Sequence, residues 1–156
     1  MRHHCRRGRW VALAFGLLSA LATAAQPRYG VFVYSSLCVQ AGSGDLGGER
    51  ISVHRFAEGD ALIYESTAGG LGWPLVAGEL NIDPHMRAIY FTVQAPEEEP
   101  RAVSGKFARD GLSVTLDGGY CGDASIARVL PRVTDFGRKL KACAPCPPAR
   151  AAVPQS

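Results

Sequence analysis

Residues 106–116 read KFARDGLSVTL, and this stretch predicts the fold of the chain. Apolar Leu112, Val114 and Leu116 alternate with polar residues, which is the period of a strand with one buried face. The Asp-Gly pair at 110–111 just before them is typical of a tight turn between two antiparallel strands. The stretch therefore predicts a β-hairpin with one apolar face.

The same pattern continues on both sides of this hairpin. Ile89, Phe91 and Val93 alternate with smaller or more polar neighbours. Further segments rich in Val, Ile, Tyr, Phe or Leu lie near residues 28–34, 50–56, 60–67, 73–82, 101–107 and 125–130, which gives about eight strands. Because the Gly-, Pro- and Asp-containing connections are too short for crossover helices, neighbouring strands are expected to pair antiparallel, as a meander.

An all-β domain over residues 26–131 has two candidate architectures. A closed or nearly closed barrel is our first expectation, since closure leaves no exposed strand edge. A two-sheet β-sandwich is the alternative. Both bury one face of each strand, so strand alternation alone does not separate them.

The first 25 residues have the composition of a secretory signal peptide. Four arginines precede an apolar run from Trp10 to Leu21, and small residues follow at 22–25. The run is short for a hydrocarbon core about 30 Å thick, which disfavours a retained membrane anchor. The Arg6-Arg7 pair leaves the export route open. An exported protein, periplasmic or extracellular and without a transmembrane segment in its mature form, is the expectation.

Charge is divided unevenly along the chain. The signal segment holds four of the 17 basic residues and none of the 14 acidic ones, so the mature chain is close to neutral and its charge does not point to nucleic acid. Residues 128–156 hold six basic residues and one acidic residue. This basic segment is expected to be solvated, to lie against the acidic domain, or to contact an anionic envelope surface.

Four cysteines remain after the signal peptide: Cys38, Cys121, Cys143 and Cys146. An even number in a small exported chain predicts two disulfides with three possible pairings. A Cys38–Cys121 bridge is favoured because each residue ends a predicted strand beside a Gly-rich loop, which leaves Cys143–Cys146 in the tail. A redox dithiol at 143–146 is disfavoured by the prolines that follow, and zinc by the single pair with ligand spacing.

The chain changes character after the last predicted strand. Residues 132–142 predict a short helix or irregular basic segment, capped at Thr134 and weakened by Gly137 by about 1 kcal/mol relative to Ala. Residues 143–156 are rich in Pro and Ala and predict a flexible tail.

No motif carries catalytic chemistry. Residues 42–47 match the letters of a dinucleotide fingerprint, but a strand follows where a helix N-terminus would have to hold the pyrophosphate. No serine lies in a nucleophile-elbow context, and His54, His85 and the scattered carboxylates form no recognisable set. No catalytic residue, metal or cofactor is therefore expected, and an enzyme is the less favoured class.

Aromatic residues are the better candidates for binding. Trp73, Tyr34, Tyr64 and Tyr90 combine a large apolar area with a polar group, as residues of recognition surfaces do. Trp73 lies between Gly and Pro, which predicts a loop at the rim of the domain. Core packing is the competing explanation for the three tyrosines.

In architecture alone, a signal peptide, a meander and a disulfide are similar to small exported barrels such as lipocalin-like carriers and bacterial lysozyme inhibitors; such folds host many functions. The sequence favours an exported, non-catalytic binding module for a small apolar ligand or an envelope protein partner, and an inhibitor is one form such a module could take. An envelope hydrolase with an unrecognised site and a structural or adhesive envelope protein are the alternatives.

The exported protein is expected to begin near Ala25 or Gln26, because small residues precede both bonds. The intact mass of the secreted product measures this directly. A mass that corresponds to the whole chain with Met1 retained contradicts the signal peptide.

Overall fold

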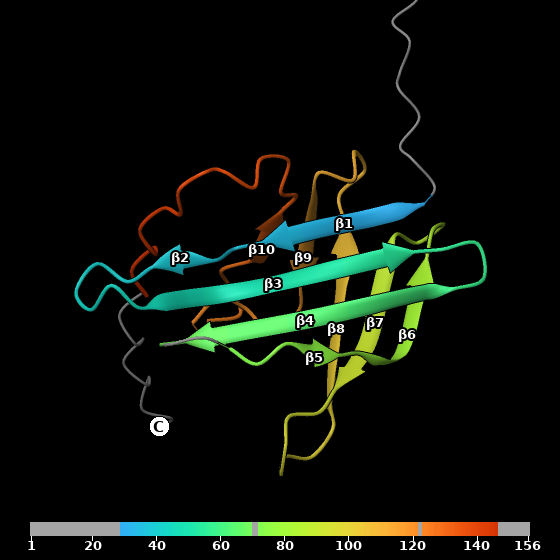
Figure 1. Ribbon diagram of the computed structural model, residues 1–156, viewed down its shortest axis with the longest axis horizontal. Coiled ribbons are helices and arrows are strands. Elements are labelled where there is room, and N and C mark those ends of the chain that lie inside the picture. The colour runs from blue at the N-terminus through green and yellow to red at the C-terminus, as the bar shows by residue number, and fades with distance from the viewer. Residues whose placement is uncertain (1–28, 70–71, 122, 147–156) are drawn as a thin grey trace, which may run out of the picture.

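The computed structural model describes residues 29–69, 72–121 and 123–146, and these form ten strands and no helix (Figure 1). The predicted signal peptide lies outside the described residues, as does the predicted tail beyond residue 146. The strands are β1 (Gly30–Ser35), β2 (Cys38–Val39), β3 (Leu46–Arg55), β4 (Asp60–Ala68), β5 (Leu75–Val76), β6 (Gly78–Asp83), β7 (Ala88–Val93), β8 (Arg101–Phe107), β9 (Ser113–Leu116) and β10 (Arg128–Pro131). Among the described residues no helix is long and apolar enough to cross a membrane.

The eight predicted strand regions are confirmed, and so is the hairpin that opened the sequence analysis. Strands β8 and β9 pair antiparallel, with Phe107 opposite Val114, and Gly111 in the turn has a φ of 66°. Leu112 departs from the prediction because it precedes the first paired residue of β9 and is 53% exposed. The region 73–82 divides at Ala77 into β5 and β6, which belong to different sheets.

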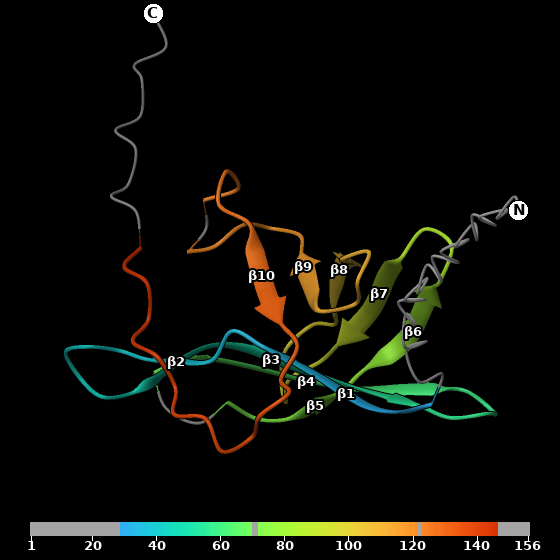
Figure 2. The same cartoon turned by 90° about the horizontal axis from the view of Figure 1, so that it is seen from above.

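The strands form two five-stranded antiparallel sheets, so the barrel prediction is wrong and the sandwich alternative is correct. Sheet A has the order β1-β3-β4-β5 with β2 beside β3, and sheet B has the order β10-β9-β8-β7-β6. Figures 1 and 2 show sheet B lying over sheet A with its strands crossing those of sheet A steeply. Among the described residues the hydrogen-bonded ladder does not continue from β1 to β10, because Tyr34 of β1 forms an isolated bridge with Arg132, just after β10, and the two strands are not paired.

The core lies between the sheets and consists of the inward-facing residues of both. Tyr64 of β4 and Phe91 of β7 are fully buried, with ring centroids 5.8 Å apart. The surrounding buried side chains are Phe32, Tyr34, Ile51, Val53, Leu62, Ile89, Val93, Val103, Val114, Leu116 and Leu130. Their alternation along each strand is what the sequence pattern predicted.

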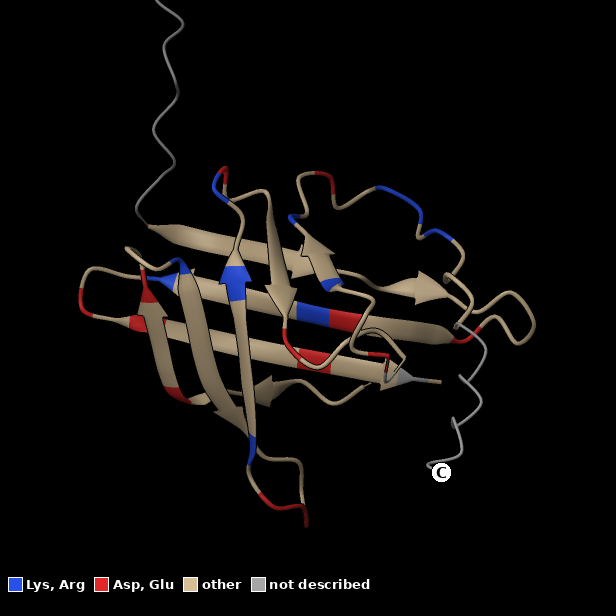
Figure 3. Ribbon diagram, turned by 180° about the vertical axis from the view of Figure 1, so that it is seen from behind, with Lys and Arg blue, Asp and Glu red and all other residues tan. Residues whose placement is uncertain are grey.

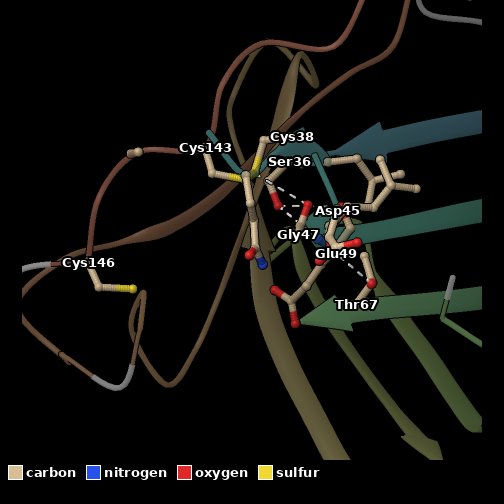
Figure 4. The surroundings of a disulfide bond; sticks show 12 residues. Ser36, Cys38, Asp45, Gly47, Glu49, Thr67, Cys143 and Cys146 are labelled. Carbon is tan, nitrogen blue, oxygen red and sulfur yellow. Dashed lines mark hydrogen bonds between the residues drawn. A yellow bond between two sulfur atoms is a disulfide. The ribbon is translucent and has the colours of Figure 1, made fainter. Parts of the chain in front are cut away.

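The two predicted disulfides are present, but their pairing is Cys38–Cys143 and Cys121–Cys146, so the favoured pairing is wrong. Figure 4 shows Cys38 and Cys143 joined beside Gly47 of β3. Edge pairing explains the result: Val39 of β2 donates its N–H to Lys141 O at 2.9 Å, and Cys143 N–H donates back to Val39 O at 2.9 Å. These backbone bonds hold Cys143 against β2.

The predicted C-terminal helix at residues 132–142 is not formed. Val133 N–H donates to Val33 O on β1 at 2.7 Å, and Ala142 bridges Val39 on β2. Backbone groups of this segment therefore form hydrogen bonds with the edge of sheet A, whereas in a helix they would bond within the segment. Figure 2 shows it running along that edge.

The described part of the predicted tail is also not free. Cys143 and Cys146 are both disulfide-bonded, and Ala144 O accepts a hydrogen bond from the Tyr120 hydroxyl at 2.8 Å. The expectation of a flexible tail from residue 143 is therefore wrong for residues 143–146.

Gly48 permits β1 and β3 to approach closely. Its φ of 102° is disfavoured for residues with a side chain, and an added Cβ would lie 2.5 Å from Ser36 O. The neighbouring Gly47 leaves room for the disulfide, since a Cβ there would lie 3.1 Å from the Cys143 sulfur.

Removing the Cys38–Cys143 bridge is expected to cost more stability than removing Cys121–Cys146. The first closes a sequence separation of 105 residues and the second one of 25. Chain entropy then gives roughly 4.7 and 3.5 kcal/mol respectively. Denaturant unfolding of C38A/C143A and C121A/C146A measures both, and non-reducing peptide maps check the pairing. A larger loss in C121A/C146A would contradict the ranking.

Candidate functional site

The four predicted binding aromatics lie in three places. Tyr64 and Trp73 line one cleft together, Tyr34 lines a second cleft, and Tyr90 is 41% exposed on β7, outside both. The clefts lie at opposite ends of β7: one beside the β6–β7 turn, the other beside the β7–β8 loop.

The first cleft, called the Trp73 cleft below, has a volume of about 210 Å³. Its walls come from β4, the segment before β5, the end of β7 and the β7–β8 loop. Trp73 is 78% exposed, whereas Tyr64 is fully buried and carries the Arg101 guanidinium 5.4 Å from its ring centroid. The lining residues are Tyr64, Ser66, Gly72, Trp73, Leu75, Val93, Ala95, Glu98 and Arg101.

A polar network holds Tyr64 in place from behind. Its hydroxyl donates to Glu49 Oε1 at 2.5 Å, and Glu49 forms an ion pair with Arg128 of β10. Arg128 also donates from Nη1 to Asp117 O at 2.6 Å. Burial raises the pKa of Tyr64, and its hydrogen bond to Glu49 raises that pKa further, so the hydroxyl remains a neutral donor at neutral pH.

The second cleft, called the arginine cleft below, has a volume of about 280 Å³. Its lining residues are Phe32, Tyr34, Val53, Arg55, Ile82, Asp83, Pro84, Arg87, Phe107, Ala108, Arg109 and Gly111. The Tyr34 hydroxyl donates to Gly111 O at 3.2 Å. Burial raises the pKa of Tyr34, although the positive charges of Arg132 and Arg55 oppose that rise.

Neither cleft has a histidine among its described lining residues. His54 lies on β3 with its ring 6.3 Å from that of Phe56, and His85 lies in the β6–β7 turn; neither lines a cleft. Each cleft has a single carboxylate among its described lining residues, Asp83 in one and Glu98 in the other. Both clefts combine apolar and charged lining residues, which suits them to bind another molecule by contact.

Two further features concern local structure. Asp83 stabilises the β6–β7 turn, since its Oδ1 accepts the N–H groups of Met86 at 2.9 Å and His85 at 2.7 Å, and these bonds lower the pKa of its carboxyl group. The Gly-rich stretch at 42–47 leads into β3, so no helix follows it. Across the described ranges, no group of three or more His, Cys, Asp or Glu residues could hold a metal ion.

The charged residues of these sites were not predicted from the sequence. Glu49 had a detectable signal, because it shares the inward phase of β3 with Ile51 and Val53, where an acid requires a buried partner. Arg101 had none: it begins a strand, and only the fold brings it over Tyr64. Arg87 and Arg109 lie at two different turns, and only the folded sheet brings these turns to the same cleft.

Comparisons of the chain with known protein families, with curated proteins and with solved structures find no match. The clefts themselves are therefore the basis for a functional proposal.

Glu49→Gln is expected to lower the free energy of unfolding by about 3 kcal/mol, because it leaves the Arg128 charge unpaired where its side chain is 18% exposed. Gln keeps an acceptor for Tyr64, so the loss reports the ion pair. Arg128→Met and the double variant complete a double-mutant cycle, in which denaturant unfolding measures the stability of each variant. The double variant is expected to lose less than the sum of the single losses; strict additivity would contradict coupling between the sheets.

Proposed function

We propose that the mature chain is an exported, non-catalytic binding module that recognises a protein partner in the cell envelope through the Trp73 cleft. The observation that carries this proposal is the 78% exposure of Trp73 at the rim of a cleft that is also lined by the buried, hydrogen-bonded Tyr64. The two disulfides indicate an oxidising environment, which supports export.

The composition of the Trp73 cleft supports a protein interface. Tryptophan, tyrosine and arginine are the residues that most often dominate binding energy, and Trp73, Tyr64 and Arg101 occur here together. The partly exposed Leu75 adds apolar area beside them. The glutamate network behind Tyr64 preorganises the floor, so little side-chain freedom is lost on binding.

The neighbouring β7–β8 loop indicates the charge of the partner. This loop carries Glu97, Glu98 and Glu99, all exposed, and projects beyond both sheets (Figure 1). Figure 3 shows these acidic positions at the tip of the loop. A partner with an apolar pocket inside a basic surface would complement both Trp73 and this loop, and a projecting loop that enters a partner's groove is how an inhibitor would act.

A carrier for an apolar ligand is less well supported. The space between the sheets is filled by the buried side chains of the core, and the two clefts, of about 210 and 280 Å³, are smaller than the ~300 Å³ at which cavities for drug-sized ligands usually begin. Both clefts open at the ends of the sandwich. A contact surface therefore fits the molecule better than an internal lumen.

Trp73→Ala is expected to weaken partner binding by about 2 kcal/mol or more, roughly thirtyfold, while leaving stability nearly unchanged. The partner is first captured from envelope extract by cross-linking to the wild-type protein, then purified and titrated against each variant. Phe136→Ala is the matched control, because Phe136 is also 78% exposed but lies on the C-terminal segment.

A denaturant melt accompanies each titration. Unchanged affinity of the Trp73→Ala protein, or an equal loss in Phe136→Ala, would contradict the proposal. A large fall in the unfolding midpoint of Trp73→Ala would assign this side chain to the core instead.

A further inference from the structure

The arginine cleft lies at the other end of the core from the Trp73 cleft and takes no part in the function proposed above. It is bounded by the β6–β7 turn, the β8–β9 turn and the ends of β1 and β3. Figure 3 shows basic positions near these turns, far from the acidic tip of the β7–β8 loop. The two ends of the molecule therefore offer different chemistry.

Two guanidinium groups at this cleft have no partner within the described part of the chain. Arg55 pairs with Asp60, with Nε 3.2 Å from Oδ1, but Arg87 and Arg109 form no ion pair or side-chain hydrogen bond with any described residue. The one carboxylate in the lining, Asp83, is already engaged by two backbone N–H groups of its own turn. Two cations are thus available to a ligand, beside one carboxylate.

The backbone presents both arginines from ordered turns. Arg87 has a φ of 54°, and its carbonyl accepts the Phe107 N–H at 2.8 Å, which ties the β6–β7 turn to the end of β8. Arg109 lies in the β8–β9 turn, which closes with Ala108 N–H donating to Ser113 O at 2.9 Å. The two side chains therefore start from two hydrogen-bonded turns that both line the cleft.

The floor of the cleft is mostly apolar. Phe32, Tyr34 and Val53 from sheet A meet Ile82 and Phe107 from sheet B. The rings of Tyr34 and Phe107 lie 5.6 Å apart, and the Tyr34 hydroxyl is held by its hydrogen bond to Gly111 O. A ligand that reaches this floor displaces water from apolar surface.

We propose that the arginine cleft binds a small amphiphilic carboxylate, with the carboxylate on Arg87 and Arg109 and the apolar stem on the Phe32–Phe107 floor. Guanidinium groups match carboxylates in charge and in planar geometry. The nearby Asp83 carboxylate favours a ligand with a single negative charge over a dianion. The volume of about 280 Å³ limits the stem to a short alkyl chain or a single ring.

Octanoate is the probe, titrated into the disulfide-intact mature protein by calorimetry, with amide shifts of Arg87, Phe107 and Gly111 recorded by NMR. Octanol supplies the stem without the charge, and acetate supplies the charge without the stem. Saturable octanoate binding, at least tenfold tighter than either control and weakened by added salt, is the expected result. Octanol binding as tightly as octanoate would overturn the proposal.

Arg87→Asn combined with Arg109→Gln removes both charges while Asn tolerates the positive φ at position 87. This double variant is expected to lose at least tenfold in octanoate affinity with an unchanged unfolding midpoint. Arg138→Gln with Lys139→Gln removes two exposed cations outside the cleft and is expected to retain the affinity. Equal losses in both double variants would show non-specific charge attraction and reject the site.

Trp73→Ala distinguishes this site from the proposed function. It is expected to bind octanoate like the wild type, because Trp73 lines the other cleft. Octanoate binding that disappears with Trp73 would place the ligand in the Trp73 cleft and overturn the assignment to the arginines.

Discussion

Two crossed sheets share one apolar core, and the rest of the structure depends on this packing. Tyr64 and Phe91 meet at its centre, each with 0% of its surface exposed, and every long strand contributes alternate residues around them. The strands of the two sheets cross steeply (Figure 2). The two clefts lie near opposite ends of β7 and are lined by residues of both sheets, so the fold determines where they are and the turns determine part of what lines them.

One charged pair between the sheets is part of this arrangement. The side chains of Glu49 and Arg128 are only 14% and 18% exposed, so much of the Coulomb energy they gain offsets lost hydration. A pair of this kind contributes more to register than to net stability, since any slip of β3 against β10 would leave a buried charge without its partner. It also places an acceptor behind the Tyr64 hydroxyl, which couples the floor of the Trp73 cleft to the alignment of the sheets.

Local pattern predicted the strands well, because a buried face imposes a period of two on each segment by itself. Ile89, Phe91 and Val93 are all buried as expected. Closure, disulfide pairing and the C-terminal segment were predicted wrongly because each depends on contacts between distant residues: a helix at 132–142 competes with the edges of β1 and β2, which local propensity does not describe. For the same reason Trp73 and Tyr64 were identified separately, and only the fold shows them in one cleft.

The order of the cysteines along the chain has a consequence for biogenesis. Cys38 bonds to Cys143 and Cys121 bonds to Cys146, so the two bridges interlace. A chain that emerges from a translocation channel N-terminus first exposes Cys38 and then Cys121 to an oxidase before either native partner arrives. Oxidation in that order joins the wrong pair, and thiol–disulfide exchange must then replace it. For a chain exported in this way, a disulfide isomerase would have to follow the oxidase, a step that bridges between consecutive cysteines would not need.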